Sequence, residues 1–219
     1  MKFRMDSPFI TVGTRLADLL LLNVYFLLGC VPLVTVGPSL TAAYSVTLKM
    51  AGNQEPFGIS RQFWTAYFQN MRHGIPLTVI FALGCYSIWI DWQLFEKLEN
   101  HPVGFLLAAV VTGALLLAHF LYIFPLEARY ENRMMTALSN SRKIFIRFFL
   151  RSVSLVGILL VQMFLLTMNA MMAYIGIFCG PILGIYTVSQ VALPIFQRLD
   201  VNTMASDGFA VGAETDREI

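Results

Sequence analysis

Long apolar runs are the feature that most limits the folds open to this chain. Runs of roughly 20 apolar residues, the length that crosses a bilayer as a helix, recur along its 219 residues. Only 13% of the residues are charged, well below the roughly one quarter typical of soluble domains. Transmembrane strands would alternate in polarity, and these runs do not. Because a helix satisfies its own backbone hydrogen bonds in lipid, we predict an all-α, polytopic membrane helix bundle.

The order of the runs predicts five long transmembrane helices and one short helix. The long helices are expected near residues 15–36, 75–90, 103–126, 152–174 and 182–196. After the first, Val36-Gly37-Pro38 predicts a break. The small-residue-rich segment 39–50 that follows is too short to span comfortably. We expect it to form a broken or re-entrant helix, which either crosses incompletely or packs back against the first. Gly176–Pro181 predicts a tight turn.

A single membrane domain is expected over residues 1–200. The polar tail, residues 201–219, lacks periodicity and is expected to be disordered. The three cysteines, Cys30, Cys85 and Cys179, lie singly in apolar sequence. This spacing favours neither a zinc site nor a disulfide framework.

Basic residues cluster between residues 122 and 151, whereas the segment 91–102 carries only Lys97. Cytoplasmic loops of membrane proteins gather Lys and Arg, so we place 127–151 and the C-terminus in the cytoplasm of a multi-pass membrane protein. The N-terminus lies outside if the chain crosses five times and inside if segment 34–50 is a broken sixth crossing. Six side chains are expected to anchor helix ends at cytoplasmic headgroups: Arg129, Arg133, Arg142, Lys143, Arg147 and Arg151.

Two amphipathic segments are candidates for contact with a partner. Residues 59–73 read as an interfacial helix, because aromatic residues with basic flanks suit the headgroup layer. A second stripe falls in the basic region. The candidate partner contacts on the two segments are Phe63, Tyr67, Met71, Met134, Leu138 and Phe145.

Few polar side chains fall inside the apolar runs. The candidates are Asp18, His119, Gln162 and Asn169. An ionisable residue within a membrane span suggests function. His119 could equally hydrogen-bond a neighbouring helix, and Asp18 could pair with Arg15 one helical turn away.

Motifs for several kinds of chemistry are missing from the sequence. It contains no GxxxxGK[ST], HExxH or GxSxG pattern, and its three histidines fall in different segments. The basic residues adjoin membrane spans rather than forming the solvated face that nucleic acids need. We therefore expect no enzyme activity, no cofactor, no metal site and no nucleic-acid binding; the lipid bilayer is the expected partner.

Three segments carry a family resemblance: Pro38-Ser39-Leu40-Thr41-Ala42-Ala43-Tyr44, the aromatic segment Phe63 to Met71, and Phe124-Pro125-Leu126-Glu127-Ala128-Arg129-Tyr130. In this order and spacing the chain resembles the YesL family of bacterial integral membrane proteins, domain of unknown function family 624. Glu127 departs from the apolar residue expected at its position.

The resemblance implies an accessory protein of a carbohydrate ABC import system, with permease subunits as possible partners, because relatives commonly accompany such importers. Two alternatives stay open. The chain could be a small transporter or channel in its own right, or a membrane sensor or regulator.

Overall fold

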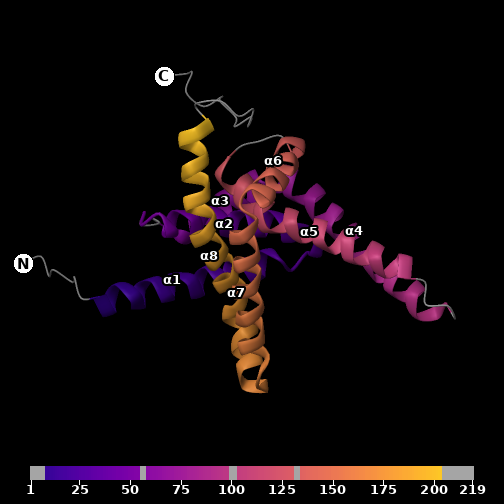
Figure 1. Ribbon diagram of the computed structural model, residues 1–219. Coiled ribbons are helices and arrows are strands. Elements are labelled where there is room, and N and C mark those ends of the chain that lie inside the picture. The colour runs from indigo at the N-terminus through magenta and orange to yellow at the C-terminus, as the bar shows by residue number, and fades with distance from the viewer. Residues whose placement is uncertain (1–7, 55–57, 99–102, 131–133, 204–219) are drawn as a thin grey trace, which may run out of the picture.

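The computed structural model describes residues 8–54, 58–98, 103–130 and 134–203, and every regular element within them is helical (Figure 1). This confirms the all-α prediction. The elements in order are α1 (Pro8–Gly29), the short 3₁₀ helix η1 (Leu33–Thr35), α2 (Val36–Ala51), α3 (Ile59–Gln69), α4 (Met71–Lys97), α5 (Val103–Arg129), α6 (Met134–Arg147), α7 (Phe149–Thr167) and α8 (Ala170–Thr203). Residues 201–203 of the predicted tail continue α8, and the rest of the tail lies outside the described residues.

Four helices of the described chain are long and apolar enough to cross a membrane. They are α4, α5, α7 and the Cys179–Arg198 part of α8. The polytopic helix bundle is thus confirmed as a class. The fifth predicted crossing, α1, is not among these four helices and stays a prediction.

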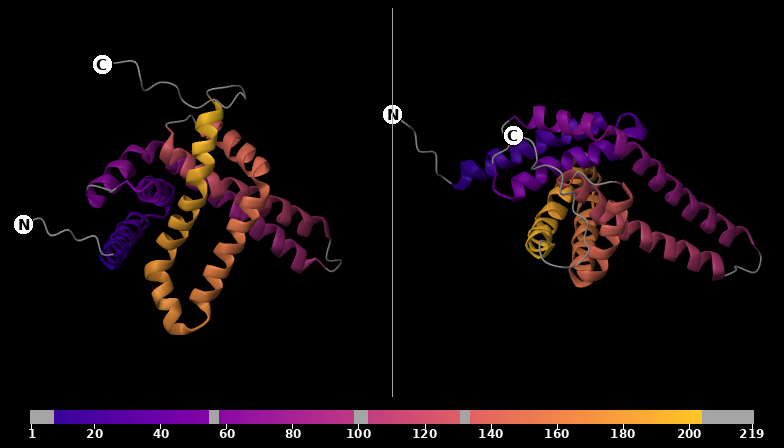
Figure 2. Two further views of the ribbon diagram at one scale, coloured as in Figure 1. Left: turned by 60° about the vertical axis from the view of Figure 1, so that its left-hand side comes forward. Right: turned by 90° about the horizontal axis from the view of Figure 1, so that it is seen from above.

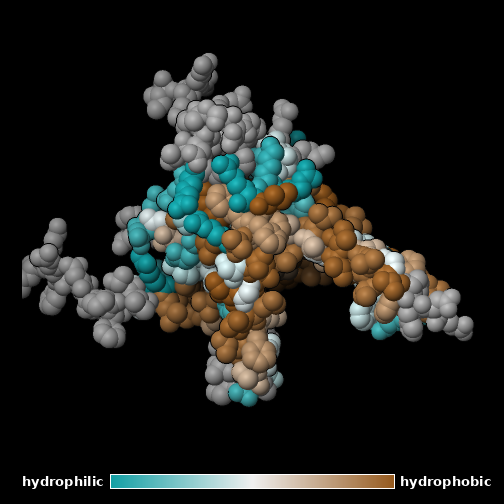
Figure 3. Space-filling model, viewed as in Figure 1, coloured by the Kyte–Doolittle hydropathy of each residue, from teal (hydrophilic) through white to brown (hydrophobic). Residues whose placement is uncertain are grey.

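The spans form two hairpins that diverge from a common end of the molecule (Figures 1 and 2). Helices α4 and α5 pair along one hairpin, and α7 and α8 pair along the other. Large apolar side chains such as Leu83, Leu107 and Leu160 face outward along them. Figure 3 shows the hairpins covered mostly by apolar residues, with polar residues gathered where the hairpins meet. We call this meeting region the head; it comprises α2, α3, α6, residues 71–77 and residues 121–130.

Helix α2 lies at the centre of the head and contacts α1, α3, α4, α5 and α8. Ala42, Ala43 and Val46 are fully buried, since small side chains let neighbouring helices approach closely. The predicted break at residues 36–38 is wrong, because α2 is continuous from Val36, whereas the predicted short helix after the first is present as α2. Pro38 falls in its first turn, where the missing N–H costs no helical hydrogen bond. At 1.5 Å per residue its 16 residues reach roughly 24 Å, short of a bilayer core of about 30 Å.

The start of α2 docks on α4 through backbone contacts. A Cβ placed on Gly74 would lie 2.6 Å from the Pro38 nitrogen and 2.7 Å from its Cδ. The Gly37 N–H donates to Thr78 Oγ1 at 2.8 Å, and that hydroxyl donates to the Gly74 carbonyl at 2.9 Å. The glycines therefore serve close helix packing.

Two sequence-based helix boundaries are wrong. The predicted helix over 59–73 is interrupted at Asn70, whose side chain donates to the Ala66 carbonyl at 2.8 Å and so competes with helical bonding. The tight turn expected at Gly176–Pro181 lies inside α8, and α7 and α8 connect instead through Met168 and Asn169. Gly176 and Gly180 face Leu166 of α7, so they permit close packing of the two helices. Pro181 lies inside α8, and helices in lipid tolerate a proline at such a position.

Candidate functional site

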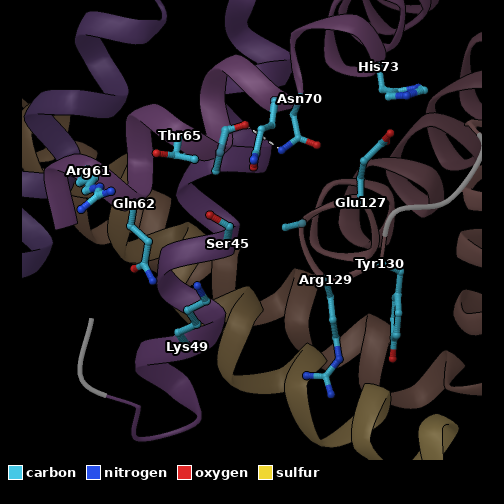
Figure 4. A pocket seen from close by; sticks show the side chains of 13 residues that line it. Ser45, Lys49, Arg61, Gln62, Thr65, Asn70, His73, Glu127, Arg129 and Tyr130 are labelled. Carbon is cyan, nitrogen blue, oxygen red and sulfur yellow. Dashed lines mark hydrogen bonds between the residues drawn. The ribbon is translucent and has the colours of Figure 1, made fainter. Parts of the chain in front are cut away.

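A polar hollow of about 930 Å³ lies in the head between α2, α3, the start of α4 and the end of α5 (Figure 4). Its volume falls in the range of ligand sites, about 300–1,000 Å³. The lining side chains come from four helices and from the short connections beside them. They are Ser45, Lys49, Arg61, Gln62, Thr65, Ala66, Gln69, Asn70, His73, Glu127, Ala128, Arg129 and Tyr130.

The amphipathic pattern of α3 explains why one wall is polar. Ile59, Phe63 and Tyr67 are buried on one face of this helix. Phe63 stacks on Tyr25 of α1 with ring centroids 6.1 Å apart. Residues at the other positions of the helical repeat, such as Arg61 and Thr65, are exposed and turn to the hollow.

Basic groups stand on separate walls of the hollow. Figure 4 shows Lys49 and Arg61 on one side and Arg129 on another. The Arg129 guanidinium also lies 5.6 Å from the centroid of the Tyr130 ring. Within the described chain, neither the Lys49 ammonium nor the Arg61 guanidinium group forms a hydrogen bond or an ion pair. Their N–H groups are therefore available to a bound molecule.

Glu127 is the acidic member of the lining. Its side chain is only 7% exposed, and neither carboxylate oxygen has a hydrogen-bond partner among the described residues. Figure 4 shows it extending toward His73, away from Lys49. Burial of a carboxyl group without hydrogen bonds is costly, so this residue is the least satisfied one of the hollow.

The predicted partner contacts of segment 59–73, on α3 and at the start of α4, lie mostly inside the protein. Phe63 is fully buried and Tyr67 is 5% exposed, and Met71 packs partly against the same core. A partner could reach α3 only on its opposite side, where Phe68 is 63% exposed.

The second group of partner candidates lies on α6. Leu138 and Phe145 are half-buried against the core, while Ile146 on the same helix is exposed. Met134 begins α6, and its side chain lies outside the described residues. A partner role for this face stays a prediction.

The four polar candidates within the apolar runs do not come together. His119 Nδ1 lies 2.7 Å from the Leu115 carbonyl of its own helix, and Gln162 Nε2 donates to the Gly180 carbonyl at 3.4 Å. Asp18 lies on α1 and Asn169 lies at the connection of α7 and α8. No polar path through the spans joins them in the described structure.

The predicted anchors lie at one end of spans α5 and α7. Arg129 ends α5, Arg142, Lys143 and Arg147 lie on α6, and Arg151 lies in the first turns of α7. Arg133 lies outside the described residues. Arg151 also stands 5.9 Å from the Phe148 ring centroid. The role of these residues as cytoplasmic anchors stays a prediction.

Sequence reasoning missed the hollow itself. It noted only the basic flanks of segment 59–73 and, at Glu127, a departure from a family pattern. The only signal in the sequence was the acidic residue Glu127 directly after an apolar segment. The described residues contain no cluster of three or more His, Cys, Asp or Glu side chains that could hold a metal ion.

The fold and the hollow define a helical membrane protein with a polar head carried on apolar hairpins. Residues 19–92 match the model of a family described as "Protein of unknown function, DUF624". This match confirms the family resemblance over a segment that runs from α1 to near the end of α4 and includes Lys49, Arg61 and His73. No curated protein and no solved structure matches the chain.

Proposed function

We propose that the chain is a membrane accessory protein, without enzyme activity, that binds another membrane protein through its head. The observation that supports this most is the separation of polar and apolar surface. Polar side chains gather in the head, whereas the hairpins present apolar surface (Figure 3). His119 and Gln162 use their hydrogen bonds on helix backbones, which favours a structural role for them over a solute path.

The finer proposal is an accessory subunit of a carbohydrate ABC importer in the bacterial cell membrane, with the C-terminus in the cytoplasm. It rests on the family resemblance and on the basic bias of residues 122–151. A head on the cytoplasmic side would place α3 and α6 where permease and ATPase subunits meet. The permease subunits are the expected direct partners.

Affinity purification of the tagged chain from its own membranes in mild detergent tests both proposals. We expect permease subunits of a sugar importer to co-purify, and deletion of the gene to lower oligosaccharide uptake. Phe68→Ser on the exposed side of α3 should reduce co-purification. The matched control is Leu98→Ser, which alters another exposed apolar residue, at the far end of α4.

Recovery of the chain alone, together with unchanged uptake in the deletion strain, would contradict an accessory role. Solute flux through the purified chain in liposomes, abolished by His119→Ala, would indicate the transporter alternative instead.

A further inference from the structure

We propose that the polar hollow binds a phosphate-bearing anion, foremost the headgroup of an anionic phospholipid. This site is independent of the accessory function proposed above. It follows from the donors that line the hollow, from their position at the ends of two spans and from the balance of charge.

The donors come from three separate helices. The side chains of Lys49 on α2 and Arg61 on α3 have no hydrogen-bond or ion-pair partner within the described chain. Thr65 adds a hydroxyl group on the same wall as Arg61. Arg129 of α5 contributes a further positive charge. Guanidinium and ammonium groups form short, charge-assisted hydrogen bonds with phosphate oxygens. Donors on several walls suit a tetrahedral anion, which accepts hydrogen bonds in several directions.

The hollow lies where one hairpin leaves the apolar region. Span α4 begins at Met71, beside Asn70 and His73 of the lining, and span α5 ends at Arg129. Val79 and Ile80, about two helical turns further along α4, are exposed apolar residues. A basic pocket between transmembrane helices at this depth is the kind of site that binds anionic lipid headgroups.

The charge balance also favours an anion. Three basic side chains, Lys49, Arg61 and Arg129, line the hollow against one carboxyl group, Glu127. That carboxyl group is buried and extends toward His73 rather than toward Lys49 (Figure 4). An anion bound at the Lys49–Arg61 wall would therefore lie closer to these basic groups than to the Glu127 carboxyl group (Figure 4).

Binding to the purified full-length chain in neutral detergent tests the proposal. The probes are phosphatidylglycerol, phosphatidylcholine, glycerol 3-phosphate and polyglutamate, with affinity measured by titration. We expect phosphatidylglycerol to bind more tightly than phosphatidylcholine. The double variant K49Q/R61Q should bind it about 30-fold more weakly, because each basic side chain near an anionic lipid contributes about fivefold.

The matched control is K97Q/R198Q, which removes one lysine and one arginine charge from exposed positions of α4 and α8 outside the hollow. It should keep an affinity close to that of the unsubstituted chain. All four positions are exposed, so both variants should fold, and circular dichroism with size-exclusion elution checks this.

The arms of the experiment separate the sources of phosphate. Binding of glycerol 3-phosphate with the same dependence on Lys49 and Arg61 would support recognition of the phosphate group itself. Binding of phosphatidylglycerol alone would support a lipid-borne headgroup. Three outcomes would overturn the proposal. The first is an equal loss of affinity for phosphatidylglycerol in the two double variants, and the second is equal affinity for phosphatidylglycerol and phosphatidylcholine. The third is binding of polyglutamate without binding of either phosphate probe.

Discussion

Glu127 places a carboxyl group in the head directly after a run of buried apolar residues. Residues 121–126, which precede it on α5, are all buried. Both of its oxygens are buried and have no hydrogen-bond partner among the described residues. An unpartnered buried polar group costs about 1–3 kcal/mol, and an ionised one costs more. Such a residue reduces stability unless something outside this chain satisfies it.

Glu127→Gln should therefore raise the free energy of unfolding by about 1 kcal/mol, because it replaces a buried ionisable group with a neutral one of nearly the same shape. Thermal or denaturant unfolding of the chain in detergent measures this change. Glu96→Gln on α4 is the control, since this exposed residue should change stability by less than about 0.5 kcal/mol. A clear loss of stability in Glu127→Gln would show instead that the carboxylate has a favourable partner.

Individual residues of the site could be singled out from the sequence, but their surroundings in the fold could not be predicted. An apolar segment around Glu127 signalled burial of its neighbours, yet the carboxyl group itself could have reached the headgroup layer by snorkelling. Likewise, the stripe of Phe63 and Tyr67 correctly indicated an apolar face of α3. Which partner covers such a face depends on long-range packing, here against Tyr25 of α1, and local periodicity does not contain that information.

Helix α2 shows the same limit at the level of elements. Gly37 and Pro38 were read as a break, but they lie in the first turn of α2 and pack closely on α4, and five other helices contact α2 in all. One polar contact marks this packing: the Thr47 and Ser189 hydroxyl oxygens lie 2.7 Å apart and fully buried between α2 and α8. These residues are 142 positions apart in sequence.

A double-mutant cycle with Thr47→Val and Ser189→Ala should give a coupling energy of about 0.6 kcal/mol, the mean for hydrogen bonds between membrane helices. Each hydroxyl also lies near a carbonyl of its own helix, which limits the loss in each single variant. Unfolding free energies of the four proteins supply the cycle. Pairing Thr47→Val with Thr167→Val, an exposed residue of α7, should give no coupling. Equal coupling in both cycles would contradict a direct contact of α2 and α8.

The existence of the elements followed from the sequence better than their boundaries. Long apolar runs allow only helices in lipid, so α4, α5 and α7 lie close to their predicted positions. Glycine and proline mark turns in water but are tolerated in membrane helices. The prediction of a turn at Gly176–Pro181 failed for that reason, because Gly180 and Pro181 lie within α8, where Gly180 faces Leu166.

At the scale of the whole molecule, the two hairpins give a direct test of the predicted orientation. In a variant without Cys30, Cys85 and Cys179, Asn169→Cys should react with an impermeant thiol reagent in intact cells. Lys143→Cys should react only after permeabilisation. The physical reason is that basic residues stay on the cytoplasmic side, whereas Asn169 lies at the opposite end of α7.

Each labelled variant must also accumulate in the membrane like the unsubstituted chain. Labelling of Lys143→Cys in intact cells, with protection of Asn169→Cys, would show that the chain is inserted the other way round. The accessory function would then have to be sought on the outer side.

The divergence of the hairpins bears on how the protein is made. The α4–α5 hairpin is a local unit that the ribosome completes before α8 is synthesised, whereas the contacts of α2 with α8 close last. Until then Thr47 and the small side chains around it lack their final neighbour, α8. A nascent chain that stops before residue 170 would expose this surface, which gives the cell's membrane proteases a feature by which unfinished copies differ from complete ones.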